Sequence, residues 1–184
     1  TDTLFDYDLV SETADNYTVQ VQAVPEAIVN AYLAPLAEAG LTVVSLELEA
    51  QAIARSILAP NDPHTYMVLD FGSTRTGVSF ISNGIVSFTT TFDIGGATQT
   101  AIIAKHFNIT TEQAEVLKRE RGLLRSGDDK DLFAVLLNNL SILRDEINKH
   151  YIFWHTHPDE HGQAKPRIEK VLLCGQSSNL AGFA

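Results

Sequence analysis

The stretch Met67-Val68-Leu69-Asp70-Phe71-Gly72-Ser73-Thr74-Arg75-Thr76-Gly77-Val78-Ser79-Phe80 joins two apolar runs through a glycine turn. The first run predicts a buried strand that ends on Asp70, and the alternating apolar residues after the turn predict a second strand. Such a turn can bind phosphate, because glycine lets the backbone approach an anion and amides and hydroxyls can donate to its oxygens. Asp70 can hold hydrated Mg2+ beside that phosphate. An ordinary β-hairpin is the alternative interpretation.

The composition is that of a globular chain with one large or two small domains. The chain has 184 residues, of which 45% are hydrophobic, and it contains no apolar run long enough for a membrane helix. Its net charge of −10 argues against nucleic acid as a partner. The single cysteine, Cys174, excludes an internal disulfide, and its apolar neighbours favour a buried strand residue over a nucleophile.

Charge is divided unevenly along the chain. Residues 1–54 contain nine Asp or Glu and no Lys or Arg, whereas residues 105–170 contain eleven of the thirteen basic residues. A solvated acidic surface is the simpler interpretation. The alternative is that the N-terminal part receives a basic segment of another protein.

Periodicity and turn residues predict an α/β chain in two domains. The stretch Ala59-Pro60-Asn61-Asp62-Pro63 is typical of a linker, which divides the chain into residues 1–60 and 61–184. Before the linker we expect strands over 17–24 and 41–48, a helix from Pro25 to about Ala39, and a helix over 49–58. After it we expect strands over 65–71, 77–82, 85–92 and 168–174, with a tight hairpin at Asn83-Gly84 between the second and third. Helices are expected over 97–106 and over 110–121, where Thr-Thr-Glu-Gln is a plausible cap, followed by a long amphipathic helix ending near Trp154. The turn after residue 174 is expected to lead into a further helix.

A second glycine turn, Gly175-Gln176-Ser177-Ser178-Asn179-Leu180, follows the last expected strand about 100 residues after the first. The order of these motifs resembles that of actin-like ATPases. Asp70-Phe71-Gly72 with Thr74 and Thr76 resembles their second phosphate loop, and the stretch from Leu173 to Gly182 resembles their adenosine loop. Ala114-Glu115-x-x-Lys118 is similar to the helix that reaches the ribose and adenine. Without this resemblance, Glu115 and Lys118 would be interpreted as a surface ion pair on one helix face.

Within this superfamily the chain resembles the PilM family of type IV pilus assembly proteins, which is related to the division protein FtsA. The likeness rests on Val24-Pro25-Glu26 to Ala39-Gly40-Leu41, Leu48-Glu49-Ala50-Gln51-Ala52-Ile53-Ala54-Arg55, Phe92-Asp93-Ile94-Gly95-Gly96 and Ala114-Glu115-Val116-Leu117-Lys118-Arg119. It implies an actin-like ATPase (ribonuclease H-like) α/β fold. Residues 1–60 would hold the end of subdomain IC and a linking helix of IA. Residues 61–184 would form the nucleotide-binding lobe, subdomain IIA with a IIB insert at about 107–155.

The resemblance implies a cytoplasmic scaffold of type IV pilus assembly at the inner face of the bacterial inner membrane. The full-length protein would bind ATP with Mg2+ and recruit the N-terminal cytoplasmic tail of a PilN-like membrane protein. It would meet the membrane only through such partners, would be at most a slow ATPase, and would be able to self-associate. An FtsA-like division filament and another ATPase or sugar kinase of the same fold are the alternatives. The implied ATP contacts are Gly72, Ser73, Thr74, Thr76, Glu115, Lys118, Gly175, Gln176 and Ser177, with a Mg2+-bound water on Asp70.

The sequence also departs from the family pattern. The first Asp-x-Gly phosphate loop and the material after the adenosine loop are not found here, so the chain resembles a fragment, and weak or no ATP binding is expected of it alone. Gln176 stands where a second glycine is usual, and its side chain could crowd the α-phosphate or the nucleoside.

Two further motifs have both a structural and a functional interpretation. Gly95-Gly96 is expected to be a strand-to-helix turn, with an interdomain hinge as the alternative. His155, His157 and His161, near Asp159 and Glu160, could bind Zn2+, but an exposed polar loop is expected instead.

Overall fold

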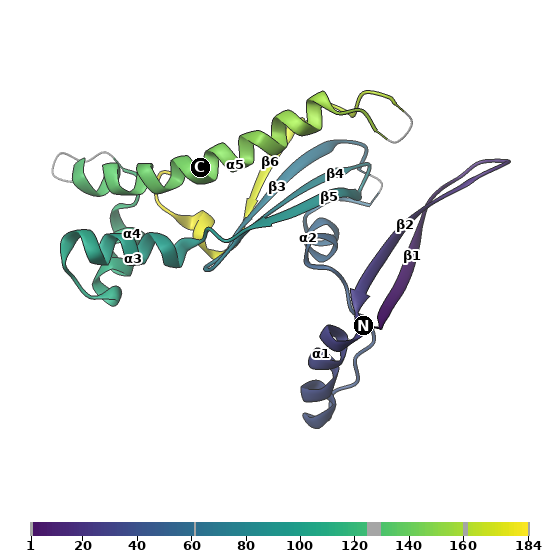
Figure 1. The fold of residues 1–184 in the computed structure, drawn as a ribbon, viewed down its shortest axis with the longest axis horizontal. Helices are drawn as coiled ribbons and strands as arrows, with labels where there is room; N and C mark the ends of the chain where they lie inside the picture. The colour runs from purple at the N-terminus through teal and green to yellow at the C-terminus, as the bar shows by residue number, and fades with distance from the viewer. Residues whose placement is uncertain (1, 61, 125–129, 160–161, 184) are drawn as a thin grey trace. The chain divides into compact units, whose positions relative to one another are not determined.

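The fold consists of two compact units, residues 1–49 and residues 50–184 (Figure 1). It was obtained as a computed structural model that describes residues 2–60, 62–124, 130–159 and 162–183. None of the described helices combines the length and the apolar character that a membrane crossing requires.

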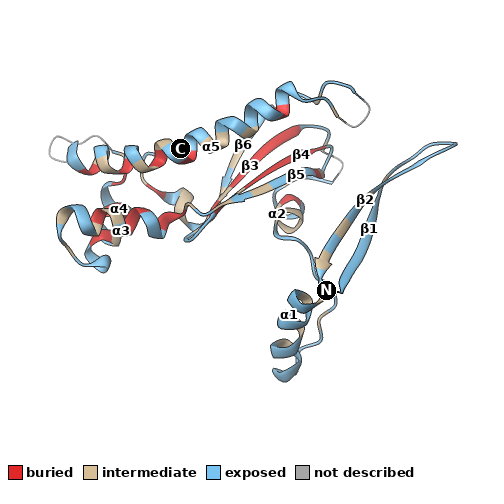
Figure 2. Ribbon diagram, in the orientation of Figure 1, coloured by how far each residue is buried: buried red, intermediate tan, exposed pale blue. Residues whose placement is uncertain are grey.

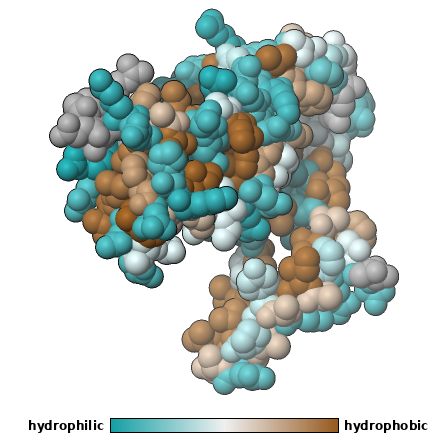
Figure 3. Space-filling view, turned by 60° about the vertical axis from the view of Figure 1, so that its left-hand side comes forward, coloured by the Kyte–Doolittle hydropathy of each residue, from teal (hydrophilic) through white to brown (hydrophobic). Residues whose placement is uncertain are grey.

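The first unit is a β-hairpin followed by a helix. Strands β1 (Thr3–Glu12) and β2 (Tyr17–Pro25) pair antiparallel, with a register shift between Leu9 and Ser11. Helix α1 (Glu26–Glu38) follows directly, with Pro25 as its N-cap. No described residue from 2 to 49 is buried, and the unit is mostly pale blue in Figure 2, with part of β2 in tan. Apolar side chains are therefore exposed here, and apolar patches are visible on α1 at the bottom of Figure 3.

Sequence analysis was partly right about this unit. The strand expected over 17–24 and the helix after Pro25 are confirmed. The strand expected over 41–48 is wrong: this segment has neither helix nor strand structure, and Val44 is 95% exposed. Alternating apolar residues make a strand only where a second strand completes the hydrogen-bond ladder, and the described residues provide none for this segment. Strand β1 was missed, although Phe5, Tyr7 and Leu9 alternate with acidic residues.

The second unit is built on a four-stranded sheet in the order β5-β4-β3-β6. Strands β3 (Thr65–Phe71), β4 (Thr76–Ser82) and β5 (Ile85–Phe92) form antiparallel neighbours, and β6 (Lys170–Cys174) pairs parallel with β3. Asn83 and Gly84 both have positive φ, as the tight hairpin predicted between β4 and β5 requires. β3 is buried at nearly every position, which explains its unbroken apolar sequence.

Helices cover both faces of this sheet. Successive side chains of a strand point to opposite faces, so Met67 and Leu69 belong to one core cluster and Tyr66 and Val68 to another. The first cluster includes Trp154 of α5 (Lys130–Thr156), which stacks on Phe80 with ring centroids 4.9 Å apart. The second includes Ala54 of α2 (Glu49–Ile57). The sheet is thus the middle layer of three.

A helical cluster lies beyond one end of the sheet. Helices α3 (Gly96–Phe107) and α4 (Thr111–Arg121) pack with each other and with α5 around Ile103, Ala114 and Leu136. The predicted cap of α4 is confirmed: the Thr110 side chain accepts from the Gln113 amide, and the Gln113 side chain accepts from the Thr110 amide. After β6, only a short 3-10 helix, η1 (Gln176–Asn179), forms where an α-helix was expected to begin.

Gly175 connects β6 to η1 at a crowded point. Its φ is +84°, and a Cβ there would lie 2.5 Å from both Asp70 Oδ1 and the Phe71 carbonyl oxygen. Gly84 has a similar φ of +77° but nothing within 4 Å of its Cβ position. An alanine at either position would have a strained backbone, but only an alanine at position 175 would also collide with neighbouring atoms.

We expect Gly175→Ala to destabilise the second unit by about 1–3 kcal/mol more than Gly84→Ala, because only the first adds an overpacking penalty to the backbone strain. Denaturant unfolding followed by the fluorescence of Trp154, the single tryptophan, measures both variants in the same unit. Equal losses of stability in the two variants would contradict the crowded junction.

Candidate functional site

Three turns that are remote in sequence meet at one backbone carbonyl. The Gly72 carbonyl oxygen, between β3 and β4, accepts from the Gly96 amide at 3.0 Å and from the Ser177 hydroxyl at 2.9 Å. The next amide of α3, that of Ala97, donates to the Ser73 carbonyl oxygen at 2.8 Å. The first glycine turn, the start of α3 and the second glycine turn are therefore fastened together.

This junction requires glycine at the start of α3. A Cβ on Gly95 would collide with the Ser73 carbonyl, and a Cβ on Gly96 would collide with the Ser177 hydroxyl. The amides of Gly96 and Ala97, at the start of α3, therefore donate to the first glycine turn and are not left to solvent. The predicted strand-to-helix turn at Gly95-Gly96 is confirmed.

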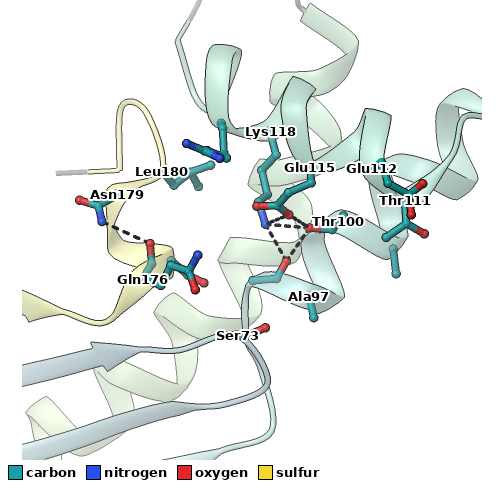
Figure 4. Close-up of a pocket in the computed structure, with 14 residues that line it drawn as sticks. Ser73, Ala97, Thr100, Thr111, Glu112, Glu115, Lys118, Gln176, Asn179 and Leu180 are labelled. Carbon is teal, nitrogen blue, oxygen red and sulfur yellow. Dashed lines mark hydrogen bonds and ion pairs between the residues drawn. The ribbon is translucent and has the colours of Figure 1, made fainter.

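A cavity of about 820 Å3 opens beside this junction. Its walls come from the first glycine turn, from α3 and α4, and from η1 with its flanking residues (Figure 4). The lining residues are Ser73, Gly96, Ala97, Thr100, Ala101, Thr111, Glu112, Glu115, Lys118, Arg119, Gln176, Ser177, Asn179 and Leu180. A cavity of this size, with polar groups at a few points, is of the kind that holds a small-molecule ligand.

A buried lysine lies at the wall between α3 and α4. Lys118 is 7% exposed, and its Nζ donates to the Gly96 carbonyl oxygen at 3.0 Å, to Thr100 Oγ1 at 2.7 Å and to Glu115 Oε2 at 2.7 Å. An ammonium group has three N–H donors, so these three acceptors use all of them. Figure 4 shows the lysine, threonine and glutamate side chains pointing toward one another.

The glutamate of this network remains ionised. Burial acts to raise the pKa of Glu115, but hydrogen bonds from Lys118 and Thr100, together with the lysine charge, outweigh burial and place the pKa below its ordinary value. The Glu115 side chain is 43% exposed, so it reaches the cavity while Lys118 stays behind it. The wall therefore presents a fixed carboxylate and no free ammonium.

The structure brings together half of the site residues that the sequence suggested. Ser73, Glu115, Lys118, Gln176 and Ser177 line the cavity. The other five, Asp70, Gly72, Thr74, Thr76 and Gly175, do not line it.

These five lie in or beside the glycine turns. Gly72 and Gly175 shape the junction behind the cavity. Thr76 is fully buried and its hydroxyl donates to the Ile94 carbonyl oxygen at 2.6 Å, while Thr74 is exposed. Asp70 is half-buried at the end of β3.

Sequence analysis missed the contribution of α3. Thr100 lies one turn after Gly96 on the same helix face, so the i, i+4 spacing of a glycine and a threonine at a helix start was the available signal. Arg119 and Glu112 of α4 were also missed, because only packing shows which side of a polar helix faces a cavity.

The histidine motif gives no metal site in the part of the chain that the structure describes. Within residues 2–60, 62–124, 130–159 and 162–183, no three His, Cys, Asp or Glu side chains are grouped as metal ligands. His155 and His157 are exposed, as expected, but His155 belongs to the last turn of α5 and only His157 lies after the helix. Glu160 and His161 lie outside the described residues.

The fold is that of the actin-like ATPases, as solved structures show. The chain matches the PilM–PilN type IV pilus biogenesis complex with a TM-score of 0.74 and 23% identity, over 99% of this chain and 52% of that one. It matches MreB5 of Spiroplasma citri bound to ADP with a TM-score of 0.67 and 19% identity, over 85% and 56% of the two chains. For the ethanolamine utilization protein EutJ of Carboxydothermus hydrogenoformans the TM-score is 0.56 and the identity 24%, over 80% and 48%. The chain spans about half the length of each of these proteins.

The family is also established. The pattern of the family described as type IV pilus assembly protein PilM matches residues 2–184, nearly the whole chain. The chain therefore belongs to the PilM family of type IV pilus assembly proteins.

We expect Lys118→Met to lower the free energy of unfolding of the second unit by about 1–3 kcal/mol, because it leaves the Gly96 carbonyl and Glu115 without their buried donor. Denaturant unfolding monitored through Trp154 gives the value. Lys105→Met is the matched control: Lys105 is exposed on α3, and its replacement should change stability by less than about 0.5 kcal/mol. Similar losses in both variants would show that the Lys118 network does not stabilise the fold.

Proposed function

We propose that this chain forms the nucleotide-binding lobe of an actin-like scaffold in type IV pilus assembly, and that the complete protein binds ATP at the cavity beside the glycine turns. The observation that carries this proposal is the meeting of both glycine turns and the α3 start at the Gly72 carbonyl, next to that cavity. The solved MreB5 with ADP has the same fold, which supports a nucleotide as the ligand.

The residues present fit such a ligand. Gly96 lines the cavity beside Ser177, and a side chain there would displace the Ser177 hydroxyl. Glu115 offers a carboxylate to ribose hydroxyls, and Arg119 offers a cation to phosphate. Ser73 and Ser177 provide the remaining polar groups from the two turns, and Gln176 lines the same cavity.

In this proposal Mg2+ accompanies the triphosphate, held through water by Asp70. One carboxylate together with phosphate oxygens is a usual magnesium environment. The amides and hydroxyls of Ser73 and Thr74 would face the phosphates. The Thr76 hydroxyl and the Gly72 amide already donate to the Ile94 and Arg75 carbonyl oxygens, so these two residues would shape the first turn. Gly175 would shape the second turn, where a Cβ would collide with Asp70 and Phe71. Phosphoryl transfer needs charge neutralisation and a positioned water, and hydrolysis by the complete protein would be at most slow.

The two-domain interpretation is part of the same proposal. Residues 1–60 would be the end of subdomain IC with a linking helix of IA, and residues 61–184 would be subdomain IIA with a IIB insert at about 107–155. Helices α4 and α5 would belong to that insert, whereas α3, which packs with them around one apolar cluster, would precede it.

We expect Asp70→Asn in the complete protein to weaken Mg-ATP binding about ten- to hundredfold. This is the effect of losing about one or two charge-assisted hydrogen bonds. Calorimetry with and without Mg2+ measures the effect, which should vanish when Mg2+ is absent. The matched control is Asp93→Asn, because Asp93 is an exposed carboxylate after β5 that belongs to neither glycine turn.

An unchanged affinity in Asp70→Asn would remove Asp70 from the site. Residues 1–184 alone carry one phosphate turn, so their affinity for Mg-ATP should lie near millimolar or weaker. Micromolar binding by this chain alone would overturn that expectation.

For the partner, we propose the basic cytoplasmic tail of a PilN-like inner-membrane protein, bound to the first unit. The unit combines acidic residues without Lys or Arg and an exposed apolar hairpin that includes Phe5, Tyr7 and Val21. Carboxylates would steer a cationic tail and apolar groups would supply contact area. The solved PilM–PilN complex supports a partner of this kind. The protein would then act in the cytoplasm, at the inner membrane, through its partners, and self-association would be compatible with the actin-like fold.

We expect a synthetic tail peptide to bind the complete protein several-fold more weakly at about 0.5 M salt than at 0.05 M, because screening shortens the range of the attraction. The double variant Asp6→Lys with Asp8→Lys reverses two exposed charges of β1. It should lower the association rate constant, with a smaller change in the dissociation rate constant. The control is Glu120→Lys, at an exposed position of α4 in the second unit. Binding that is independent of salt, or equally sensitive to Glu120→Lys, would contradict this location.

A further inference from the structure

Thr100 connects every member of the network at the cavity wall. It is 4% exposed, on α3, and its Oγ1 lies 3.0 Å from the Gly96 carbonyl oxygen, 2.7 Å from Lys118 Nζ and 2.5 Å from Glu115 Oε2. A single hydroxyl is therefore within hydrogen-bond distance of a carbonyl, an ammonium and a carboxylate. Sequence analysis gave this residue no role.

The donors and acceptors of the network assign the hydroxyl proton. Lys118 has three donors, and they account for the Gly96 carbonyl, Thr100 Oγ1 and Glu115 Oε2. The Gly96 carbonyl is then already satisfied, while an ionised carboxylate oxygen is the stronger acceptor. The Thr100 proton thus goes to Glu115 Oε2, across the shorter of its two distances.

This arrangement fixes one oxygen of Glu115 and leaves the other open. Oε2 accepts from both Thr100 and Lys118, whereas Oε1 has no hydrogen-bond partner among the described residues. Glu115 lines the cavity, and its carboxylate cannot rotate without breaking these two charge-assisted bonds, one from α3 and one from α4. Figure 4 shows these contacts at the cavity wall.

We propose that Thr100 is a positioning residue for nucleoside recognition: it holds Glu115 so that the free carboxylate oxygen accepts a hydrogen bond from a ribose hydroxyl of the bound nucleotide. This inference rests on the proposed ATP site and adds to it the means of selecting a ribonucleotide. Lys118 holds the same oxygen, but it also supports the fold. Thr100 is a better residue to mutate than Lys118, because Thr100→Val removes the hydroxyl without a change of charge or volume.

The experiment compares Thr100→Val, which removes only the hydroxyl, with Thr100→Ser, which retains it, in the complete protein. Calorimetry measures the affinities for ATP, 2′-deoxy-ATP and 3′-deoxy-ATP with Mg2+. The parent protein should prefer ATP about tenfold over at least one deoxy analogue, the effect of about one hydrogen bond to a charged group. Thr100→Val should reduce that preference to about threefold or less, and Thr100→Ser should keep it.

The outcomes separate this inference from the proposed function. A parent protein that does not bind ATP would overturn both. A parent that binds ATP without preferring it over either analogue would overturn the inference alone, and so would Thr100→Val with an undiminished preference. Circular dichroism shows whether each variant is folded. Should Thr100→Val not fold, Thr100→Ala removes the same hydroxyl in a smaller side chain and is judged by the same preference ratio, which a purely structural role would leave unchanged.

Discussion

The Gly72 carbonyl is the point on which the second unit depends. It accepts hydrogen bonds from the Gly96 amide and the Ser177 hydroxyl, which lie 24 and 105 residues further along the chain. A buried carbonyl must find such partners, and here the partners tie the β3–β4 turn to the start of α3 and to the turn after β6. The cavity exists because these three segments meet there, and glycines allow the approach because a Cβ would collide at Gly95, Gly96 and Gly175.

The sheet and its helices keep that junction rigid. β3 is buried on both faces, between the cluster with Trp154 of α5 and the cluster with Ala54 of α2, so the strand that leads into the first turn has little freedom to move. On the other side, α3 and α4 are held to each other by the apolar cluster around Ile103 and Ala114 and by the buried Lys118. Burial of an ammonium group costs free energy unless its donors are paired. The ammonium is explained by the three acceptors that it satisfies, one of which belongs to the cavity wall.

Unlike the second unit, the first unit has no buried core in the part that the structure describes. None of its described residues is buried, and a two-stranded hairpin with one helix has too little core to be stable by itself in water. Its apolar side chains, such as Phe5 and Tyr7, are thus available for contact with another surface, and its acidic side chains favour a basic one. The buried core and the cavity beside the glycine turns belong to the second unit, whereas the first unit exposes its apolar and acidic side chains.

The sequence by itself determined the strands of the second unit, the β4–β5 hairpin, the cap of α4 and the family, because these depend on local periodicity, turn residues and the order of motifs. It named Ser73, Glu115, Lys118, Gln176 and Ser177, which all line one cavity. It was wrong about a strand over 41–48, since a strand needs a partner that no local pattern reveals. Only the tertiary structure showed that Thr76 bonds to the Ile94 carbonyl and that Thr100 joins Lys118 to Glu115. Such roles are set by which groups meet across separate elements, and packing decides that, not spacing along the chain.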